Sequence, residues 1–220
     1  MPRKKVKVKI CGLTNWPDAR CACDAGADFL GFNFYRRSPR YIDPVRARAI
    51  VRRLPEGTAS VGIFVNEPED DLVRIAQAVG LKYVQLHGDE TPAAVSRLRR
   101  ALPTVRIIKA IRVRKTFRVK QLSRFRDATA ILLDGFDGRR PGGTGKTFDW
   151  SLAARANGQT PIVLAGGLTP ENIAEAIRAV RPYAVDVCSG VEASLGKKDR
   201  AKIKALMRAV NGGQSARRNK

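Results

Sequence analysis

The sequence predicts an α/β fold, a single-domain TIM (β/α)8 barrel over residues 1–210 that is followed by a flexible basic tail over 211–220. Short apolar runs rich in β-branched residues alternate with amphipathic stretches along the whole chain. Eight such units in 220 residues leave about 27 residues each, which suits a βα repeat and leaves no length for a second domain. An open doubly wound sheet is less favoured, because no dinucleotide-binding fingerprint follows the first run.

Eight runs are expected to be strands, because most are continuous apolar segments of the kind buried on both faces of a parallel sheet. They cover residues 6–12, 29–34, 61–65, 83–87, 106–113, 130–134, 162–166 and 184–189.

Helix-start signals stand between these runs. Asn15, Asp43 and Thr169 each precede a segment with proline in its first two positions. The carboxylates at 69–71 place negative charge where a further helix is expected to begin. Each apolar run is therefore expected to lead into a helix.

The charge balance is strongly basic: 42 Lys and Arg against 20 Asp and Glu give a net charge of +22. Such an excess favours polyanion binding. However, the basic residues recur at helical spacing among apolar ones, and aromatic residues make up only 6% of the chain. We therefore expect solvated helix faces and no specific nucleic-acid partner. Non-specific, salt-sensitive binding to polyanions is expected instead.

Other classes of protein are disfavoured by composition. No run approaches the roughly 20 apolar residues of a membrane helix. Four cysteines, with Cys21 and Cys23 only two apart, do not make a disulfide scaffold. We expect a soluble cytoplasmic protein with no membrane partner. The sequence does not indicate an oligomeric state.

A barrel of this kind carries its active site at the carboxyl ends of its strands. Lys9 and Cys11 lie at the end of the first run and, with the two-residue period of a strand, face the same side. A neighbouring cation lowers the pKa of a thiol, so Cys11 is a candidate base. The alternative, a small buried thiol without function, stays open on position alone.

Three further strand ends carry candidate groups. The basic loop at 36–40, which includes Arg40, suits an anionic carboxylate or phosphate. His87, the single histidine, is either a general base or a structural hydrogen-bonding group. Asp134 directly follows an apolar run and suits a general acid or a helix cap. Because no second histidine or carboxylate cluster accompanies His87, we expect no metal.

Glycines follow the last two runs, at Gly166, Gly167 and Gly190 beside Ser189. In this fold these two loops often bind phosphate through backbone N–H groups, so a phosphate site is favoured over two plain turns. The segment 142–147, which includes Gly145, superficially resembles a nucleotide-binding P-loop. Its glycine spacing and its place after the sixth run argue against that function.

Eight segments, taken in order, resemble the phosphoribosylanthranilate isomerase family of tryptophan biosynthesis. The matching segments run from Lys9 to Asp199 and read KICGLTN, GFNFYRRSPRYI, VGIFVNE, YVQLHGDE, ILLD, GGTGKTFDWSL, GGLTPENI, and AVDVCSGVE followed by GKKD.

The resemblance implies an isomerase that converts N-(5-phosphoribosyl)anthranilate to 1-(2-carboxyphenylamino)-1-deoxyribulose 5-phosphate by an Amadori rearrangement without a cofactor. It implies Asp134 as general acid, Cys11 as general base and Arg40 as the group that holds the anthranilate carboxylate. The remaining implied substrate-binding residues are Gly145, Gly166, Gly167, Ser189 and Gly190, around the phosphate, and His87.

Two positions depart from the family pattern. Residue 188 is Cys where the family usually has Ser, and in a closed barrel Cys188 is expected close to Cys11, so that oxidation could couple the two. The loop 135–141 carries Arg139 and Arg140 and is expected to alter access without displacing Asp134.

Two alternative functions remain. One is a related phosphoribosyl barrel isomerase of histidine biosynthesis, or an enzyme of dual specificity. Cys11 argues against it, because that chemistry normally uses a pair of Asp residues. The other alternative, from a different class, is a polyanion- or nucleic-acid-binding protein on a barrel scaffold.

Overall fold

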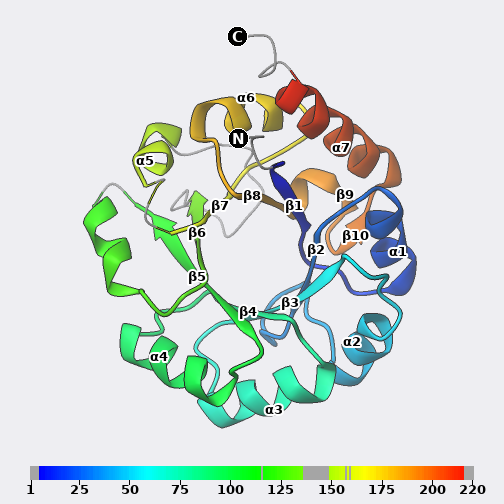
Figure 1. Cartoon of the computed structure of the whole chain (residues 1–220). Helices are drawn as coiled ribbons and strands as arrows, with labels where there is room; N and C mark the ends of the chain where they lie inside the picture. The colour runs from blue at the N-terminus through cyan, green and yellow to red at the C-terminus, as the bar shows by residue number, and fades with distance from the viewer. Residues whose placement is uncertain (1–4, 115, 136–148, 157, 159, 216–220) are drawn as a thin grey trace.

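Eight parallel strands form a closed barrel in chain order, β1 to β8, in a computed structural model that describes residues 5–114, 116–135, 149–156, 158 and 160–215 (Figure 1). The predicted barrel and its eight strands are confirmed. The strands are β1 (Lys7–Ile10), β2 (Phe29–Asn33), β3 (Ala59–Phe64), β4 (Tyr83–Leu86), β5 (Arg106–Val113), β6 (Ala130–Gly135), β7 (Ile162–Ala165) and β8 (Ala184–Val187).

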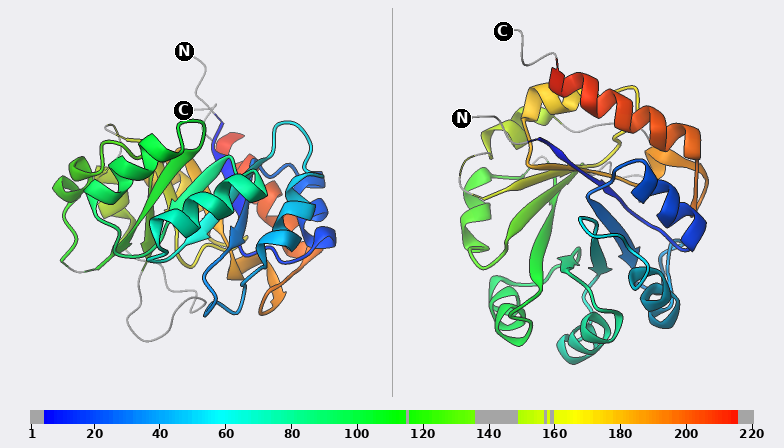
Figure 2. Two further views of the ribbon diagram at one scale, coloured as in Figure 1. Left: turned by 90° about the horizontal axis from the view of Figure 1, so that it is seen from below. Right: turned by 45° about the vertical axis from the view of Figure 1, so that its right-hand side comes forward.

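Helices cover the outside of the barrel on all sides (Figure 2). They are α1 (Trp16–Asp24), α2 (Pro44–Val51), α3 (Glu69–Val79), α4 (Pro92–Ala101), α5 (Trp150–Arg155), α6 (Ile173–Val180) and α7 (Arg200–Ser215). No helix within the described part of the chain is both long and apolar enough to cross a membrane.

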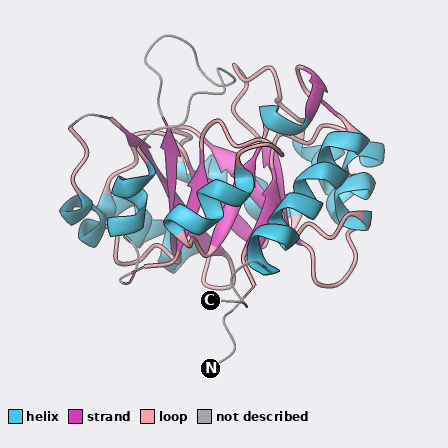
Figure 3. Cartoon of the chain, turned by 90° about the horizontal axis from the view of Figure 1, so that it is seen from above, coloured by secondary structure: helices cyan, strands magenta, loops and turns pink. Residues whose placement is uncertain are grey.

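A short hairpin of β9 (Glu192–Ser194) and β10 (Lys197–Lys198) follows β8 and the 3-10 helix η2 (Ser189–Val191). It lies at the end of the barrel toward which the strands point (Figure 3). The strand analysis did not predict this hairpin.

The capping signals are confirmed at two helices and wrong at a third. The side chain of Asn15 accepts a hydrogen bond from the Asp18 N–H, and Asp43 caps α2 in the same way. Thr169 does not cap α6, which begins at Ile173. The amide of Asn172 explains the delay, because it bonds back to the Thr169 N–H and to the Gly167 carbonyl and holds a turn before the helix.

The fifth unit also differs from the expected helix. It contains the 3-10 helix η1 (Val119–Arg124), of which Leu122 is the buried residue. A segment with so small an apolar face cannot support several turns of α-helix. At the carboxyl end, α7 runs five residues past position 210, to Ser215, and packs against α6 and α1. The tail prediction for 216–220 falls outside the described residues.

Two apolar layers build the core. The larger lies between the strands and the helices, and the smaller fills the amino-terminal half of the barrel interior with residues such as Phe29, Tyr83 and Ile108. Farther along the same inward faces the side chains become polar, with Lys9 and Asp186 buried among them. The barrel interior therefore changes from apolar to charged toward the carboxyl ends of the strands.

Replacing Asn15 by Ala removes the side-chain acceptor from the first turn of α1. We expect the free energy of unfolding to fall by about 1 kcal/mol, as measured by denaturant titration. Gln77→Ala, at an exposed position within α3, is the matched control and is expected to change it by less than about 0.5 kcal/mol. Equal effects of the two substitutions would contradict a capping contribution.

Candidate active site

Four candidate side chains reach the open end of the barrel because a strand turns alternate side chains to the same face. Each of the four lies at or just after the end of a strand, two residues beyond a side chain that points into the barrel interior. The pairs of interior and terminal residues are Lys9 and Cys11, Gln85 and His87, Leu132 and Asp134, and Asp186 and Cys188.

Cys11 continues the pairing of β1 with β8. Its N–H donates to the Val187 carbonyl at 2.9 Å, one residue past the register pair Ile10 and Val187. Gly31 leaves room for the thiol, because a Cβ at that position would stand 2.9 Å from Cys11 Sγ. Cys11 is a half-buried residue, and its neighbours hold the thiol in place.

A buried ion pair lies beneath this thiol. Lys9 Nζ and Asp186 Oδ2 are 2.8 Å apart, and the two side chains are only 1% and 8% exposed. Burial raises the pKa of Asp186 to about 7, against the opposing effect of Lys9. Burial also opposes the charge of Lys9, but Asp186 and Cys11 outweigh it, so the pKa of Lys9 is raised. Cys11 and Asp134 both add negative charge next to Asp186.

The Cys11 thiol is poised to ionise. A hydrogen bond from Cys188 lowers its pKa most, and the nearby cations Lys9 and Lys198 lower it further, while burial acts in the opposite direction. The net result is a Cys11 pKa well below its usual value. A thiolate in this position can act as a base.

Arg40 forms a two-pronged ion pair with Glu192 of the hairpin. Its Nε and Nη2 lie 2.8 and 2.6 Å from the two carboxylate oxygens. Lys198 Nζ reaches the same carboxylate at 2.9 Å, and burial of Glu192 is outweighed by these two cations, so the Glu192 pKa is lowered. A guanidinium has five N–H donors, and this pair uses two of them. The other donors of Arg40 can bind an anion.

His87 contacts Asp134 across the opening. Its Nε2 lies 3.3 Å from Asp134 Oδ2, and its Nδ1 lies 2.8 Å from the amide nitrogen of Gln85. With the Gln85 amide donating to Nδ1, the ring proton sits on Nε2 and His87 donates to the Asp134 carboxylate. Asp134 is 31% exposed, so its other oxygen can meet a ligand.

A second buried ion pair fixes the loop that carries His87. Lys109 Nζ lies 2.7 Å from Glu90 Oε2 and donates to the carbonyls of Leu86 and Gly88 on either side of His87. Glu90 in turn accepts from the backbone N–H of Gly88. This network holds the histidine loop rigid against β5.

The glycine loops after β7 and β8 lie against each other. Gly166 and Gly167 have positive φ angles of 86° and 65°. A side chain on Gly190 would collide with the Leu168 carbonyl, and one on Gly166 would collide with the Gly135 N–H. The structure thus brings the loops of Gly166, Gly167, Ser189 and Gly190 together beside β6. Gly145, Arg139 and Arg140 fall outside the described residues.

The strand-end analysis singled out Cys11, Lys9, Arg40, His87 and Asp134, and the structure places four of them around the open end and Lys9 in the barrel interior beneath Cys11. It missed Glu192, Lys198, Gln85 and the pair of Lys109 with Glu90. Glu192 and Lys198 stand within two of the quoted segments, GVE and GKKD, which was the available signal. Gln85 and Glu90 stand within a third quoted segment, YVQLHGDE, and only Lys109 lies outside all of them. Among the described residues, no group of His, Cys, Asp and Glu could hold a metal ion.

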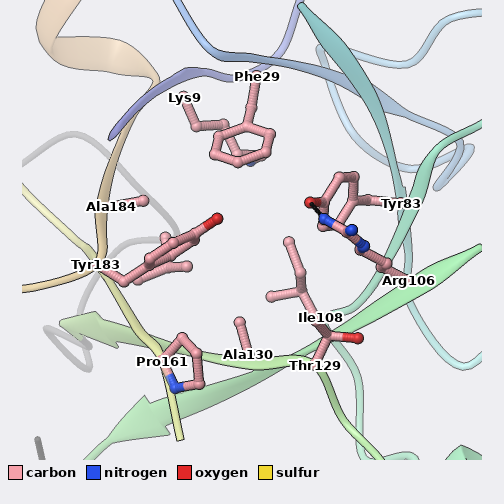
Figure 4. Close-up of a pocket in the computed structure, with 11 residues that line it drawn as sticks. Lys9, Phe29, Tyr83, Arg106, Ile108, Thr129, Ala130, Pro161, Tyr183 and Ala184 are labelled. Carbon is pink, nitrogen blue, oxygen red and sulfur yellow. Dashed lines mark hydrogen bonds between the residues drawn. The ribbon is translucent and has the colours of Figure 1, made fainter. Parts of the chain in front are cut away.

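A separate pocket lies at the amino-terminal end of the barrel (Figure 4). It has a volume of about 110 Å³, and its walls are mostly apolar, with the rings of Phe29, Tyr83 and Tyr183 around it. Arg106 stands at this pocket and donates to the Tyr83 hydroxyl at 2.7 Å. Its position away from Cys11 and Asp134 leaves the opposite end of the barrel as the candidate active site.

The raised pKa of Asp186 sets a pH dependence of stability. The folded chain binds this proton more tightly than the unfolded chain does, so the contribution of Asp186 to the free energy of unfolding falls as pH rises from 3.8 to about 7. We expect Asp186→Asn to flatten this decline in denaturant titrations across that window. Asp24→Asn, at an exposed position of α1, is the control and is expected to retain it. An unchanged slope in Asp186→Asn would contradict the assignment.

Comparison with known proteins identifies the family. Residues 8–209 match the family described as N-(5'phosphoribosyl)anthranilate (PRA) isomerase. The N-(5'-phosphoribosyl)anthranilate isomerase of Pelobacter propionicus is 50% identical over 203 residues, which cover 92% of this chain and 94% of that protein. The relative of the same name from Moorella thermoacetica is 49% identical over 93% of this chain and 89% of that protein.

Solved structures of the same family are also similar to this chain. Phosphoribosyl anthranilate isomerase from Thermotoga maritima superposes with a TM-score of 0.86 and 44% identity, over 94% of this chain and 99% of that one. A second structure, in complex with reduced 1-(o-carboxyphenylamino)-1-deoxyribulose 5-phosphate, has a TM-score of 0.83 and 41% identity over the same shares of the two chains. The chain belongs to the phosphoribosylanthranilate isomerase family.

Proposed function

We propose that this chain catalyses the rearrangement of N-(5-phosphoribosyl)anthranilate to 1-(2-carboxyphenylamino)-1-deoxyribulose 5-phosphate, with Cys11 as general base and Asp134 as general acid. One observation carries the proposal: the open end of the barrel holds a thiol whose pKa is well below its usual value, together with a partly exposed carboxylate on another strand. In a chain of this family, that pair supplies the two proton transfers that the reaction needs.

The reaction begins at the sugar ring. Protonated Asp134 gives its proton to the ring oxygen, the bond from that oxygen to C1 breaks, and the anthranilate nitrogen forms a Schiff base with C1. The Cys11 thiolate then removes the proton from C2. The resulting enolamine tautomerises to the ketone as C1 gains a proton. The sum is an internal transfer of hydrogen between carbons, so no redox cofactor is required.

His87 and Gln85 orient the acid. By donating from Nε2 to Oδ2, His87 leaves Oδ1 of Asp134 to face the ring oxygen of the substrate. Gly166 keeps that oxygen free, because a Cβ there would stand 2.9 Å from Oδ1. We assign His87 to positioning and to contact with the substrate.

Two anionic groups of the substrate have complementary sites. The free donors of Arg40 bind the anthranilate carboxylate, and Glu192 holds the guanidinium in place for it. Backbone N–H groups at Gly166, Gly167, Ser189 and Gly190 bind the phosphate. Gly145 is included in the phosphate site by the family pattern alone. The bound compound in the second related structure also carries one carboxylate and one phosphate, which supports this division.

The alternative functions are less well supported. The comparisons identify phosphoribosylanthranilate isomerases and favour neither the histidine-pathway isomerase nor a dual-specificity enzyme. The base is a thiol, whereas the histidine-pathway chemistry calls for a pair of carboxylates. We propose the cytoplasm as the location, because a catalytic thiol beside a second cysteine requires a reducing compartment.

Cys11→Ser and Asp134→Asn test the two catalytic roles. Each is expected to lower kcat by about a hundredfold or more in a coupled assay with freshly generated phosphoribosylanthranilate, because each removes one proton transfer. Cys23→Ser, at a half-buried position of α1 on the outside of the barrel, is the control and is expected to keep the wild-type rate. An inactive wild type, or near-full rates in both variants, would show the mechanism to be wrong.

Arg40→Lys tests the carboxylate site. Lysine keeps the charge but cannot form the two-pronged contact, so KM is expected to rise about tenfold or more, with a smaller change in kcat. Arg37→Lys, an exposed position in the same loop, serves as control. If both variants show the wild-type KM, Arg40 does not bind the substrate.

A further inference from the structure

We propose that Cys11 and Cys188 are a redox modification site: a peroxide converts them to a reversible disulfide, which removes the catalytic base. The chemistry of the site rests on the geometry alone. Only its effect on catalysis rests on the proposed function.

The register of β1 and β8 places the two cysteines side by side. The strands pair in parallel from Lys7 with Ala184 to Ile10 with Val187, so the next positions are Cys11 and Cys188. Neighbouring strands lie about 4.8 Å apart. Disulfides join Cα atoms separated by roughly 4.4–6.8 Å. The backbone spacing therefore suits a bridge without a large movement.

The side chains also point to the same place. Two residues earlier on the same strands and the same inward face, Lys9 and Asp186 meet at 2.8 Å. Side chains two residues apart on a strand face the same way, so Cys11 and Cys188 also turn toward the same part of the barrel opening. Cys188 Sγ would also stand 3.0 Å from a Cβ at Gly12, so it lies directly against the Cys11–Gly12 backbone. Both cysteines are half-buried residues at the open end of the barrel.

The pKa values of the two thiols are shifted in opposite directions, which gives the two sulfurs different roles. Cys11 is the attacking group, since Cys188, Lys9 and Lys198 lower its pKa. Cys188 keeps its proton, because the hydrogen bond to Cys11 and burial both raise its pKa. Lys198 Nζ lies 3.9 Å from Cys188 Sγ and supplies positive charge at the place where the second thiol reacts.

The reaction balances in two steps. The Cys11 thiolate attacks one oxygen of the peroxide, the O–O bond breaks, and Cys11 becomes a sulfenic acid while an alkoxide or hydroxide leaves and takes a proton from water. Cys188 then attacks the Cys11 sulfur, the S–O bond breaks, and the hydroxyl leaves with the Cys188 proton as water. The two sulfurs together lose two electrons and the peroxide gains them. A dithiol reverses the bond.

The other two cysteines do not compete. Cys21 and Cys23 lie on α1 outside the barrel, and positions two apart on a helix do not face each other. Burial raises the pKa of Cys23, so Cys23 is not the thiol that the peroxide oxidises first. The reaction is therefore confined to the pair at the strand ends.

The test uses the full chain, first reduced and then freed of reductant, and titrated with hydrogen peroxide. Free thiols are trapped with N-ethylmaleimide, and intact mass and peptide mapping identify the product. We expect two of the four thiols to disappear without added oxygen and the Cys11 and Cys188 peptides to be linked. Isomerase activity is expected to fall about a hundredfold in step with the link and to return with dithiothreitol.

Two variants sharpen the result. Cys23→Ser is the matched control and is expected to form the same link. Cys188→Ser has no resolving thiol, so excess peroxide is expected to take Cys11 on to a sulfinic acid, with a loss of activity that dithiothreitol does not restore.

Oxygen added to Cys11 in the wild type without a link, or a link that includes Cys21 or Cys23, would overturn the proposal. A reduced chain without isomerase activity would overturn the proposed function instead, and would leave the mass measurement of the disulfide intact.

Discussion

The buried ion pair of Lys9 and Asp186 is the interaction on which the site depends. It joins the first and last strands where the barrel closes, and it places an ammonium directly under the Cys11 thiol. Removing two charges from water costs on the order of several kcal/mol per ion, and Asp186 Oδ1 has no hydrogen-bond partner among the described residues. An apolar pair would pack there at lower cost. The pair therefore serves the chemistry above it rather than stability.

The other buried cations near the open end are also paired with carboxylates. Glu192 lies between Arg40 and Lys198, and Lys109 lies against Glu90, so the buried cations of the site each have an acidic partner. Among the described residues, these buried clusters therefore contribute little to the basic excess of the chain. A positive surface still favours the capture of a substrate with a phosphate and a carboxylate, because long-range potential concentrates anions near the barrel.

The sequence predicted those parts of the molecule that follow local rules. Apolar runs set the strands, Asn15 and Asp43 set two helix starts, and period-two alternation turned Lys9 and Cys11 to one face. Contacts between distant segments could not be derived in the same way. The pairing of Arg40 with Glu192 joins residues 152 positions apart. It depends on a hairpin whose two short strands carry no strand pattern of their own. The late start of α6 likewise depends on which backbone groups the Asn172 amide bonds to, since it accepts from the Thr169 N–H and donates to the Gly167 carbonyl.

The hydrogen bond between Gln85 and His87, which supports Asp134, can form with either group as the donor. An amide has a donor end and an acceptor end of nearly equal shape, and Gln85 Oε1 has no hydrogen-bond partner among the described residues. A half-turn of the amide would present that oxygen to His87 Nδ1 without sacrificing another bond. The imidazole proton would then sit on Nδ1, and Nε2 would accept from an Asp134 that carries its proton on Oδ2, whereas the present arrangement leaves Oδ1 as the protonated oxygen of the acid. The hydrogen bond can thus form whichever of the two carboxyl oxygens carries the proton.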